Sequence, residues 1–205
     1  LELLSAWTDP KGADPLLGFW WPLAPRDPTI VATALREHLA GLVAAPPAVR
    51  EVALQLAARL GIDEAAEGLL GTFRNPQAPG ERRSNSLRAL AVLEHAEVDA
   101  LIGNGLDDRQ TAVRIAAREL LADRNPEAAL LALNAALAEG EISEQQAAFD
   151  LLSRLPESPQ RTALLCDGVD RLLSGSLPAE LELEVLAAAS NCSDGQLMEK
   201  LADYR

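Results

Sequence analysis

The sequence predicts an all-α protein, an α-solenoid in which short helices stack as antiparallel pairs. Three observations lead to this fold class. An Arg- and Ala-rich segment with an apolar stripe recurs about every 30–36 residues, a spacing typical of helical repeats. Hydrophobic residues make up 48% of the chain but aromatic residues only 3%, so the core consists mainly of Leu, Ala and Val. Leu and Ala are strong helix formers, while β-branched and aromatic residues, which favour strands, are scarce.

The first 27 residues differ from the rest, and we expect an atypical N-terminal cap there. The three tryptophans of the chain, Trp7, Trp20 and Trp21, lie in this segment among several prolines. One interpretation is a hydrophobic cap that covers the first repeat, because terminal repeats are usually atypical. The other is a docking patch toward a preceding domain, because exposed tryptophan pairs are rare without a partner. The sequence leaves both open.

From residue 28 to residue 205 we expect one continuous helical-repeat domain with about five helix pairs. Short connections favour antiparallel neighbours. The expected pairs are 28–43 with 49–60, 63–73 with 80–95, 97–106 with 109–122, 126–137 with 143–155, and 158–173 with 178–189, followed by a last helix at 194–204.

Local signals place several of these helix ends. Asp27 is a candidate N-cap, and Pro28 then occupies the first turn, where its missing N–H is harmless. Gly61 is expected just past the end of its helix, where a left-handed backbone favours glycine. Asn125 precedes a proline and starts the fourth pair. Ser143, with Gln146 three residues later, resembles a capping box.

The charge of the chain restricts its partners. Eighteen basic against 31 acidic residues give a net charge of −13, and there is no basic stripe of the kind that binds phosphates. No run of about 18 apolar residues is present, as a membrane-spanning helix would need. We therefore expect a protein partner, no nucleic acid and no membrane insertion. The chain begins at Leu1 without Met, as a fragment or a mature form would.

The second helix of the third pair carries the sharpest motif. It comprises Asp107-Asp108, Val113-Arg114, Ala116-Ala117 and Leu120-Leu121. This pattern resembles the consensus of HEAT repeats, in which an acid in the turn and an Arg in the second helix form a ladder between repeats. Arg50, Arg88 and Arg114 occupy comparable positions, although Arg88 lacks an obvious turn acid. The resemblance covers about residues 28–190 and implies a fold rather than an activity.

A narrower resemblance rests on the two ends of the chain. Residues 14–23, and the tail 182–189 with Leu197, Leu201 and Tyr204, are similar to a segment of large bacterial secreted proteins. Those proteins combine a β-propeller resembling quinone-dependent sugar dehydrogenases, a HEAT-like middle and a c-type cytochrome. The resemblance implies the middle piece of such a multidomain protein and a periplasmic or secreted location, with the cytoplasm not excluded. The chain departs from them in lacking Cys-x-x-Cys-His and propeller strands, so we expect no cofactor.

Two other features raise chemical alternatives. Some HEAT-like enzymes hold two irons with His-Glu pairs, and here Glu37-His38 and Glu94-His95 have the reversed order. Such a site needs about six ligands, and the chain has two histidines, so solvated helix ends are the preferred interpretation. Cys166 and Cys192 are interpreted as small buried or half-buried residues, or as a disulfide between adjacent repeats in an oxidising compartment.

Two functions therefore compete. The favoured one is a non-catalytic scaffold or protein-interaction module, because the Ala/Leu stripe explains nearly every apolar position without surplus polar residues in the core. The alternative is a HEAT-repeat enzyme with a metal or cofactor site. No catalytic, cofactor-binding or metal-ligating residue is expected.

Overall fold

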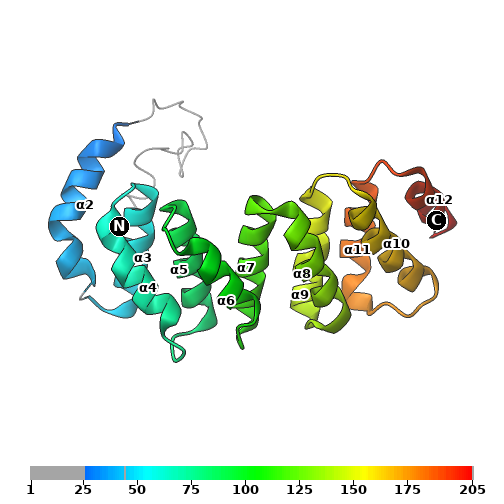
Figure 1. The fold of residues 1–205 in the computed structure, drawn as a ribbon, viewed down its shortest axis with the longest axis horizontal. Coiled ribbons are helices and arrows are strands. Elements are labelled where there is room, and N and C mark those ends of the chain that lie inside the picture. The colour runs from blue at the N-terminus through cyan, green and yellow to red at the C-terminus, as the bar shows by residue number, and fades with distance from the viewer. Residues whose placement is uncertain (1–25, 44, 205) are drawn as a thin grey trace, which may run out of the picture. The chain divides into compact units, whose positions relative to one another are not determined.

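A computed structural model describes residues 26–43 and 45–204 (Figure 1). Within these residues all regular structure is helical and no strand is present, which confirms the expected all-α class. The tryptophans of the expected cap, Trp7, Trp20 and Trp21, lie outside the described residues, so the cap and the docking patch both stay predictions.

The chain divides into two compact units, Leu1–Val98 and Asp99–Arg205. The first contains α2 (Pro28–Val43), α3 (Pro47–Arg59), the 3₁₀ turn η1 (Asp63–Ala65), α4 (Ala66–Arg74) and α5 (Gly80–Val92). The boundary falls in the first turn of α6 (Val98–Leu106), and the second unit continues with α7 (Thr111–Arg124), α8 (Pro126–Glu139), α9 (Ile142–Arg154), α10 (Pro159–Leu173), η2 (Ala179–Leu181), α11 (Glu182–Ser190) and α12 (Gly195–Tyr204). One continuous domain from 28 to 205 stays a prediction.

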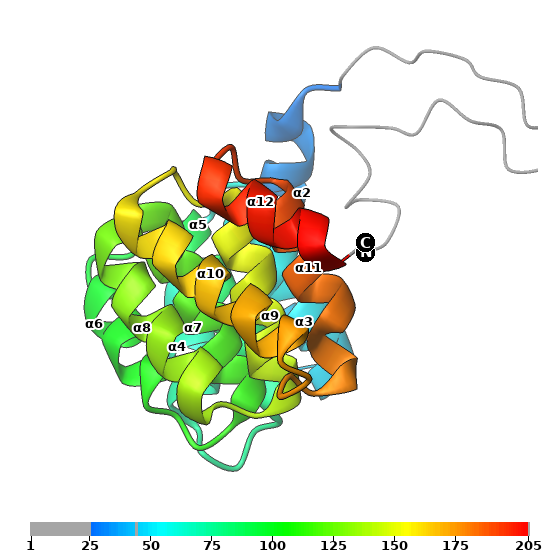
Figure 2. The same cartoon turned by 90° about the vertical axis from the view of Figure 1, so that its right-hand side faces the viewer.

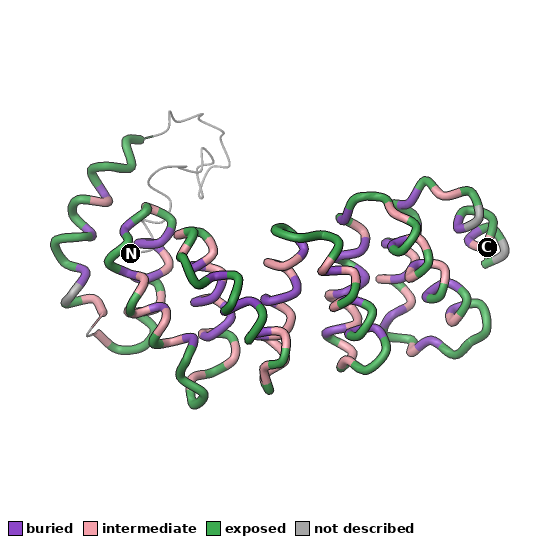
Figure 3. The backbone as a smooth tube through the Cα atoms, in the orientation of Figure 1, coloured by how far each residue is buried: buried purple, intermediate pink, exposed green. Residues whose placement is uncertain are grey.

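In the first unit α3 packs against α2 and α5, and α5 packs against α4. The core residues recur every three or four positions along each helix, so that one stripe of the helix faces its neighbours. Figure 3 shows this alternation of buried and exposed segments. The largest fully buried side chains of this unit are Ile62, Leu69, Leu87 and Leu90.

The second unit has two layers. Helices α7, α9 and α11 pack in sequence in one layer, and α8, α10 and α12 pack in sequence in the other. Figure 2 shows α8 and α11 on opposite sides of this unit. The core between the layers includes Leu133, Phe149, Leu165 and Val185, all fully buried. The packing is tight, because a Cβ added at Gly168 would lie 2.9 Å from Cε1 of Phe149.

Three of the predicted helix ends depend on residues close to them in the sequence. Asp27 accepts the Thr29 N–H at 2.8 Å, and Asn125 accepts the Ala128 N–H at 3.1 Å, as N-caps do. Gly61 has a φ of +66°. Its N–H donates to the Ala58 carbonyl while the next N–H donates to Ala57, which is a Schellman motif. These three predictions are confirmed.

Two end predictions were wrong. Helix α5 ends at Val92 rather than at residue 95, because Glu94 takes a left-handed φ of 51° and its N–H donates to the Ala91 carbonyl. The capping box of α9 belongs to Glu141 and Glu144, not to Ser143 and its partner, because the helix begins one residue earlier than expected. The carboxylate of Glu144 accepts the Glu141 N–H at 3.1 Å.

The remaining helix starts shift by a few residues. Helix α3 begins at Pro47, because proline fits the first helical position. Helix α7 begins at Thr111, since Asp108 Oδ1 first accepts the Gln110 N–H at 2.9 Å and holds the turn. The expected helices at 63–73 and 178–189 each open with a 3₁₀ turn, η1 and η2.

Candidate functional site

The strongest polar cluster of the described residues joins α7 to α9. Arg114 and Arg118 lie one turn apart on α7, and Glu144 lies in the first turn of α9. Arg114 Nε and Nη2 donate to the two carboxylate oxygens of Glu144 at 2.8 and 2.6 Å. Arg118 Nη1 donates to Glu144 Oε1 at 2.6 Å. One carboxylate therefore accepts a two-pronged guanidinium and a second arginine, an arrangement with fixed geometry.

The centre of this cluster is buried. Glu144 is only 2% exposed, and Arg118 is buried as well. Hydrogen bonds from Arg114, which has the largest effect, from Arg118 and from the Glu141 N–H together lower the pKa of Glu144 to about 2, against the opposing effect of burial. The same carboxylate raises the pKa of Arg114. The cluster is thus permanently charged at neutral pH and cross-links two helices of one layer.

The expected ladder residues lie as follows. Arg114 reaches the turn before its helix through Nη1, which donates to the backbone carbonyl of Asp108 at 2.8 Å. Asp107 is exposed and Asp108 is half-buried in that turn. Arg50 and Arg88 lie in the first unit, on α3 and α5.

The first unit has a comparable cross-link beside these arginines. Glu51 of α3 accepts Asn85 Nδ2 of α5 at 3.1 Å and pairs with Arg82 of the same helix at 3.3 Å. Arg88 Nη1 donates to Asn85 Oδ1 at 3.4 Å. No side-chain hydrogen bond or ion pair is found between Arg50 and the described residues. The contact between α3 and α5 at this place is therefore made by Glu51, the residue next to Arg50, and the ladder role of Arg50 stays a prediction.

Two other buried arginines bind backbone carbonyls instead of a carboxylate, and the sequence analysis identified neither of them. Arg161, in the first turn of α10, donates from Nε to the Leu152 carbonyl at 2.7 Å and from Nη2 to the Asn191 carbonyl at 3.3 Å. Arg83 of α5 donates from Nε to the Phe73 carbonyl at 2.8 Å and lies 5.5 Å from the Phe73 ring centre. Each cation caps carbonyls at the C-terminal end of a neighbouring helix, where the helix dipole favours positive charge.

A signal for these buried charges was present in the sequence. Arg161 precedes Leu165 and Val169 at steps of four, and Glu144 precedes Ala148 and Leu152 in the same way. Both therefore extend an apolar stripe at helical spacing. A charge on such a stripe indicates a buried group that needs a partner, although its partner cannot be named from the spacing.

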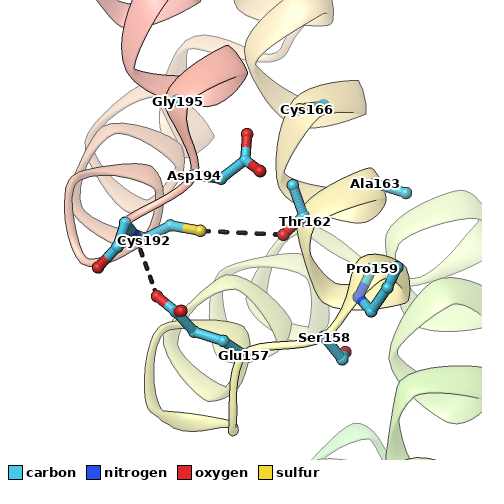
Figure 4. A pocket seen from close by; sticks show the side chains of 10 residues that line it. Glu157, Ser158, Pro159, Thr162, Ala163, Cys166, Cys192, Asp194 and Gly195 are labelled. Carbon is cyan, nitrogen blue, oxygen red and sulfur yellow. Dashed lines mark hydrogen bonds between the residues drawn. The ribbon is translucent and has the colours of Figure 1, made fainter.

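A depression of the second unit lies between the first turns of α10 and α12 (Figure 4). Its volume is about 730 Å³, and both cysteines line it without a disulfide between them. Cys192 Sγ lies 4.0 Å from Thr162 Oγ1, and Cys166 lies one turn further along α10. Burial raises the pKa of the Cys166 thiol, which disfavours the nucleophilic thiolate.

The two Glu-His pairs both lie in the first unit. Glu37 and His38 are exposed on α2. His95 lies in the turn after α5, where its Nδ1 accepts the Glu97 N–H at 3.2 Å. Among the described residues, no three His, Cys, Asp or Glu side chains form a group that could hold a metal ion.

An apolar groove runs between α8 and α10, with a volume of about 370 Å³. Leu130, Leu131 and Leu164 line it, together with Ala163. Leu131 is 77% exposed, which is unusual for a leucine next to other apolar side chains. We call this surface the α8–α10 groove.

Comparison of the chain with family profiles, with curated proteins and with solved structures finds no match. None of the helices within the described residues combines the length and apolar character needed to span a bilayer. The function is therefore argued from the geometry described above.

Proposed function

We propose that this chain is a non-catalytic HEAT-like α-solenoid that serves as a scaffold and protein-interaction module. The observation that carries the proposal is a set of polar contacts between alternate helices that join residues about one repeat apart. Arg114 of α7 and Glu144 of α9 are separated by 30 residues, and Gln146 of α9 and Glu180 of η2 by 34. In the first unit Asn85 to Glu51 is separated by 34.

This spacing supports stacked repeats for a physical reason. In a solenoid each unit contacts only its neighbours, so a polar contact between equivalent positions joins residues one repeat apart. The contact separations agree with the recurrence of the Arg- and Ala-rich segments in the sequence. The two layers of the second unit, each built from every other helix, are the arrangement that such stacking produces.

A stacked array converts its apolar stripes into its own core and leaves an extended surface for other molecules. We propose that this surface binds protein, either adjacent domains or a separate partner. We further propose that the chain is one segment of a bacterial multidomain redox protein with a periplasmic or secreted location, on the resemblance of its ends to the segment between a propeller and a cytochrome.

Two experiments test these proposals. Metal analysis of the purified 205-residue protein after exhaustive dialysis should find no stoichiometric iron or zinc, and retained metal at one equivalent or more would replace the scaffold by the enzyme alternative. Sequencing of the complete gene should find propeller-coding sequence upstream and a Cys-x-x-Cys-His motif downstream. A gene that encodes this chain alone would exclude the multidomain proposal while leaving the scaffold intact.

A further inference from the structure

We propose that the α8–α10 groove binds a basic amphipathic helix of a partner protein, an inference that rests on the proposed scaffold function. The groove lies between α8 and α10, two neighbouring helices of one layer of the second unit. A cleft between two helices with apolar walls is a common seat for a third helix, whose apolar residues at i, i+3, i+4 and i+7 enter the groove.

The apolar residues of the α8–α10 groove lie next to one another. Leu130 and Leu164 are half-buried at its base, and Leu131 projects at its edge with 77% of its surface exposed. Because Ala163 is small and exposed, α10 presents no bulky side chain there. The site therefore offers one prominent apolar anchor beside a shallow hollow, as in the centre of a protein interface.

The groove continues across α10 into the depression between α10 and α12. Ala163 lines both hollows and therefore lies on the ridge between them, which we call the saddle. On the far side Glu157 and Asp194 line the second hollow (Figure 4). A helix that lays its apolar stripe on Leu131 and crosses Ala163 brings its polar side toward these carboxylates.

Charge decides which kind of helix fits. Residues 99–205 carry 19 acidic and 9 basic side chains, a net charge of −10. Glu127 borders the groove, and Glu139 and Asp167 are exposed on the same two helices, while Asp170 of α10 is paired with Lys200 of α12. Helix α8 contains no basic residue. The basic residues of α10 are Arg161, buried on backbone carbonyls, and Arg171, half-buried in the last turn, so acidic side chains outnumber basic ones around the groove.

A cationic partner is therefore favoured, and an acidic one is repelled. A second copy of this chain would bring the same negative charge to the surface, so self-association through this groove is disfavoured. The occupant is a helix with Leu-type anchors on one face and Lys or Arg on the other.

The test uses the full 205-residue chain and a fluorescein-labelled synthetic peptide of about 18 residues, long enough for five helical turns. The peptide has Leu at i, i+3, i+4 and i+7 and Lys at the remaining positions. Fluorescence anisotropy should give one site per chain with a dissociation constant in the micromolar range, weakening as salt is added. Leu131→Ser should weaken binding at least about tenfold, as expected for loss of a central anchor.

The matched control is Leu183→Ser. Leu183 lies on α11 in the other layer and is 78% exposed, so its loss removes equal apolar surface away from the groove. Its binding should equal that of the parent. Ala163→Trp, which fills the saddle at an exposed helix position, should weaken binding as Leu131→Ser does. All three changes affect exposed side chains, so far-UV circular dichroism and the urea midpoint should stay at the parental values.

Three results would overturn the groove assignment. The first is equal affinity for the parent and Leu131→Ser, and the second is equal binding of a peptide whose Leu residues are replaced by Ser. The third is equal binding of a peptide with Glu in place of Lys. These results would overturn the groove assignment without giving evidence for a metal or cofactor site. Failure of the scaffold proposal would instead be seen as retained metal in the analysis described above, so the two failures can be told apart.

Discussion

Replacement of Glu144 by Gln is the most informative perturbation of the fold. The substitution keeps the shape of the side chain but removes the charge that holds Arg114 and Arg118. Arg118 is then a cation only 9% exposed, and its Nε already has no hydrogen-bond partner among the described residues. We expect Glu144→Gln to lower the free energy of unfolding of the second unit.

The magnitude follows from the pKa of Glu144. A carboxyl with a pKa of 4.5 in the unfolded chain and about 2 in the folded protein stabilises the fold by about 3 kcal/mol at neutral pH, since each pKa unit is worth about 1.4 kcal/mol. Loss of one partner of a buried ion pair costs about 3–5 kcal/mol in other proteins, which agrees with this value.

The sign of the pH dependence is fixed by the same shift. Because folding lowers the pKa of Glu144, the stabilisation is complete above about pH 4.5 and is lost as the pH falls toward 2. Urea unfolding followed by far-UV circular dichroism should therefore show a difference of about 3 kcal/mol between parent and Glu144→Gln at neutral pH. The difference should decrease as the pH falls below about 4.5 and approach zero only below about pH 2, where Glu144 of the parent becomes neutral as well.

Asp150→Asn is the matched control. Asp150 lies on the same helix and pairs with Arg154 at 2.6 Å, but its side chain is 64% exposed. Its replacement should change the free energy of unfolding by less than about 0.5 kcal/mol, as for exposed pairs in general. A neutral-pH effect of Glu144→Gln below about 1 kcal/mol, or an effect independent of pH, would refute the assignment of a buried charged cluster.

Three further substitutions concern Arg114 of α7, the turn after α5 and the turn after α3. Arg114→Ala should lower the free energy of unfolding by about 1–3 kcal/mol, because Glu144 and the Asp108 carbonyl lose a charged donor, and an unchanged melting temperature would argue against the HEAT-like assignment of that repeat. Glu94→Gly should raise the free energy of unfolding by about 0.5–1 kcal/mol, since glycine tolerates the φ of 51°. Gly61→Ala makes the opposite change at a φ of +66° and should lower the free energy of unfolding. The urea midpoint should therefore rise for Glu94→Gly and fall for Gly61→Ala.

Much of the fold followed from short-range patterns. The positions of the helices, the all-α class, and the caps at Asp27 and Asn125 depend on side chains within one or two turns of each other. Gly61 ends its helix because its own backbone allows a left-handed φ. Glu94 also takes a left-handed φ, and its N–H and that of His95 donate to the carbonyls of Ala91 and Leu90 at the end of α5. The sequence did not reveal this end, because residues other than glycine rarely adopt that backbone conformation.

The candidate sites depended more on packing. The motif around Arg114 predicted that this arginine would pair with an acid. The acid it pairs with is Glu144, which lies 30 residues away on another helix and was not identified by the motif. Cys166 and Cys192 line one hollow because α10 and the start of α12 come together, which neither residue's neighbours indicate.

The recurrence of Arg- and Ala-rich segments thus determined which residues form helices and which stripe of each helix is buried, since both depend on a period of about 3.6 residues along one chain segment. Only the tertiary structure decided which charges meet, which leucines stay exposed and where a groove opens. Those outcomes depend on how two helices distant in sequence approach each other, and helical periodicity contains no information about that distance.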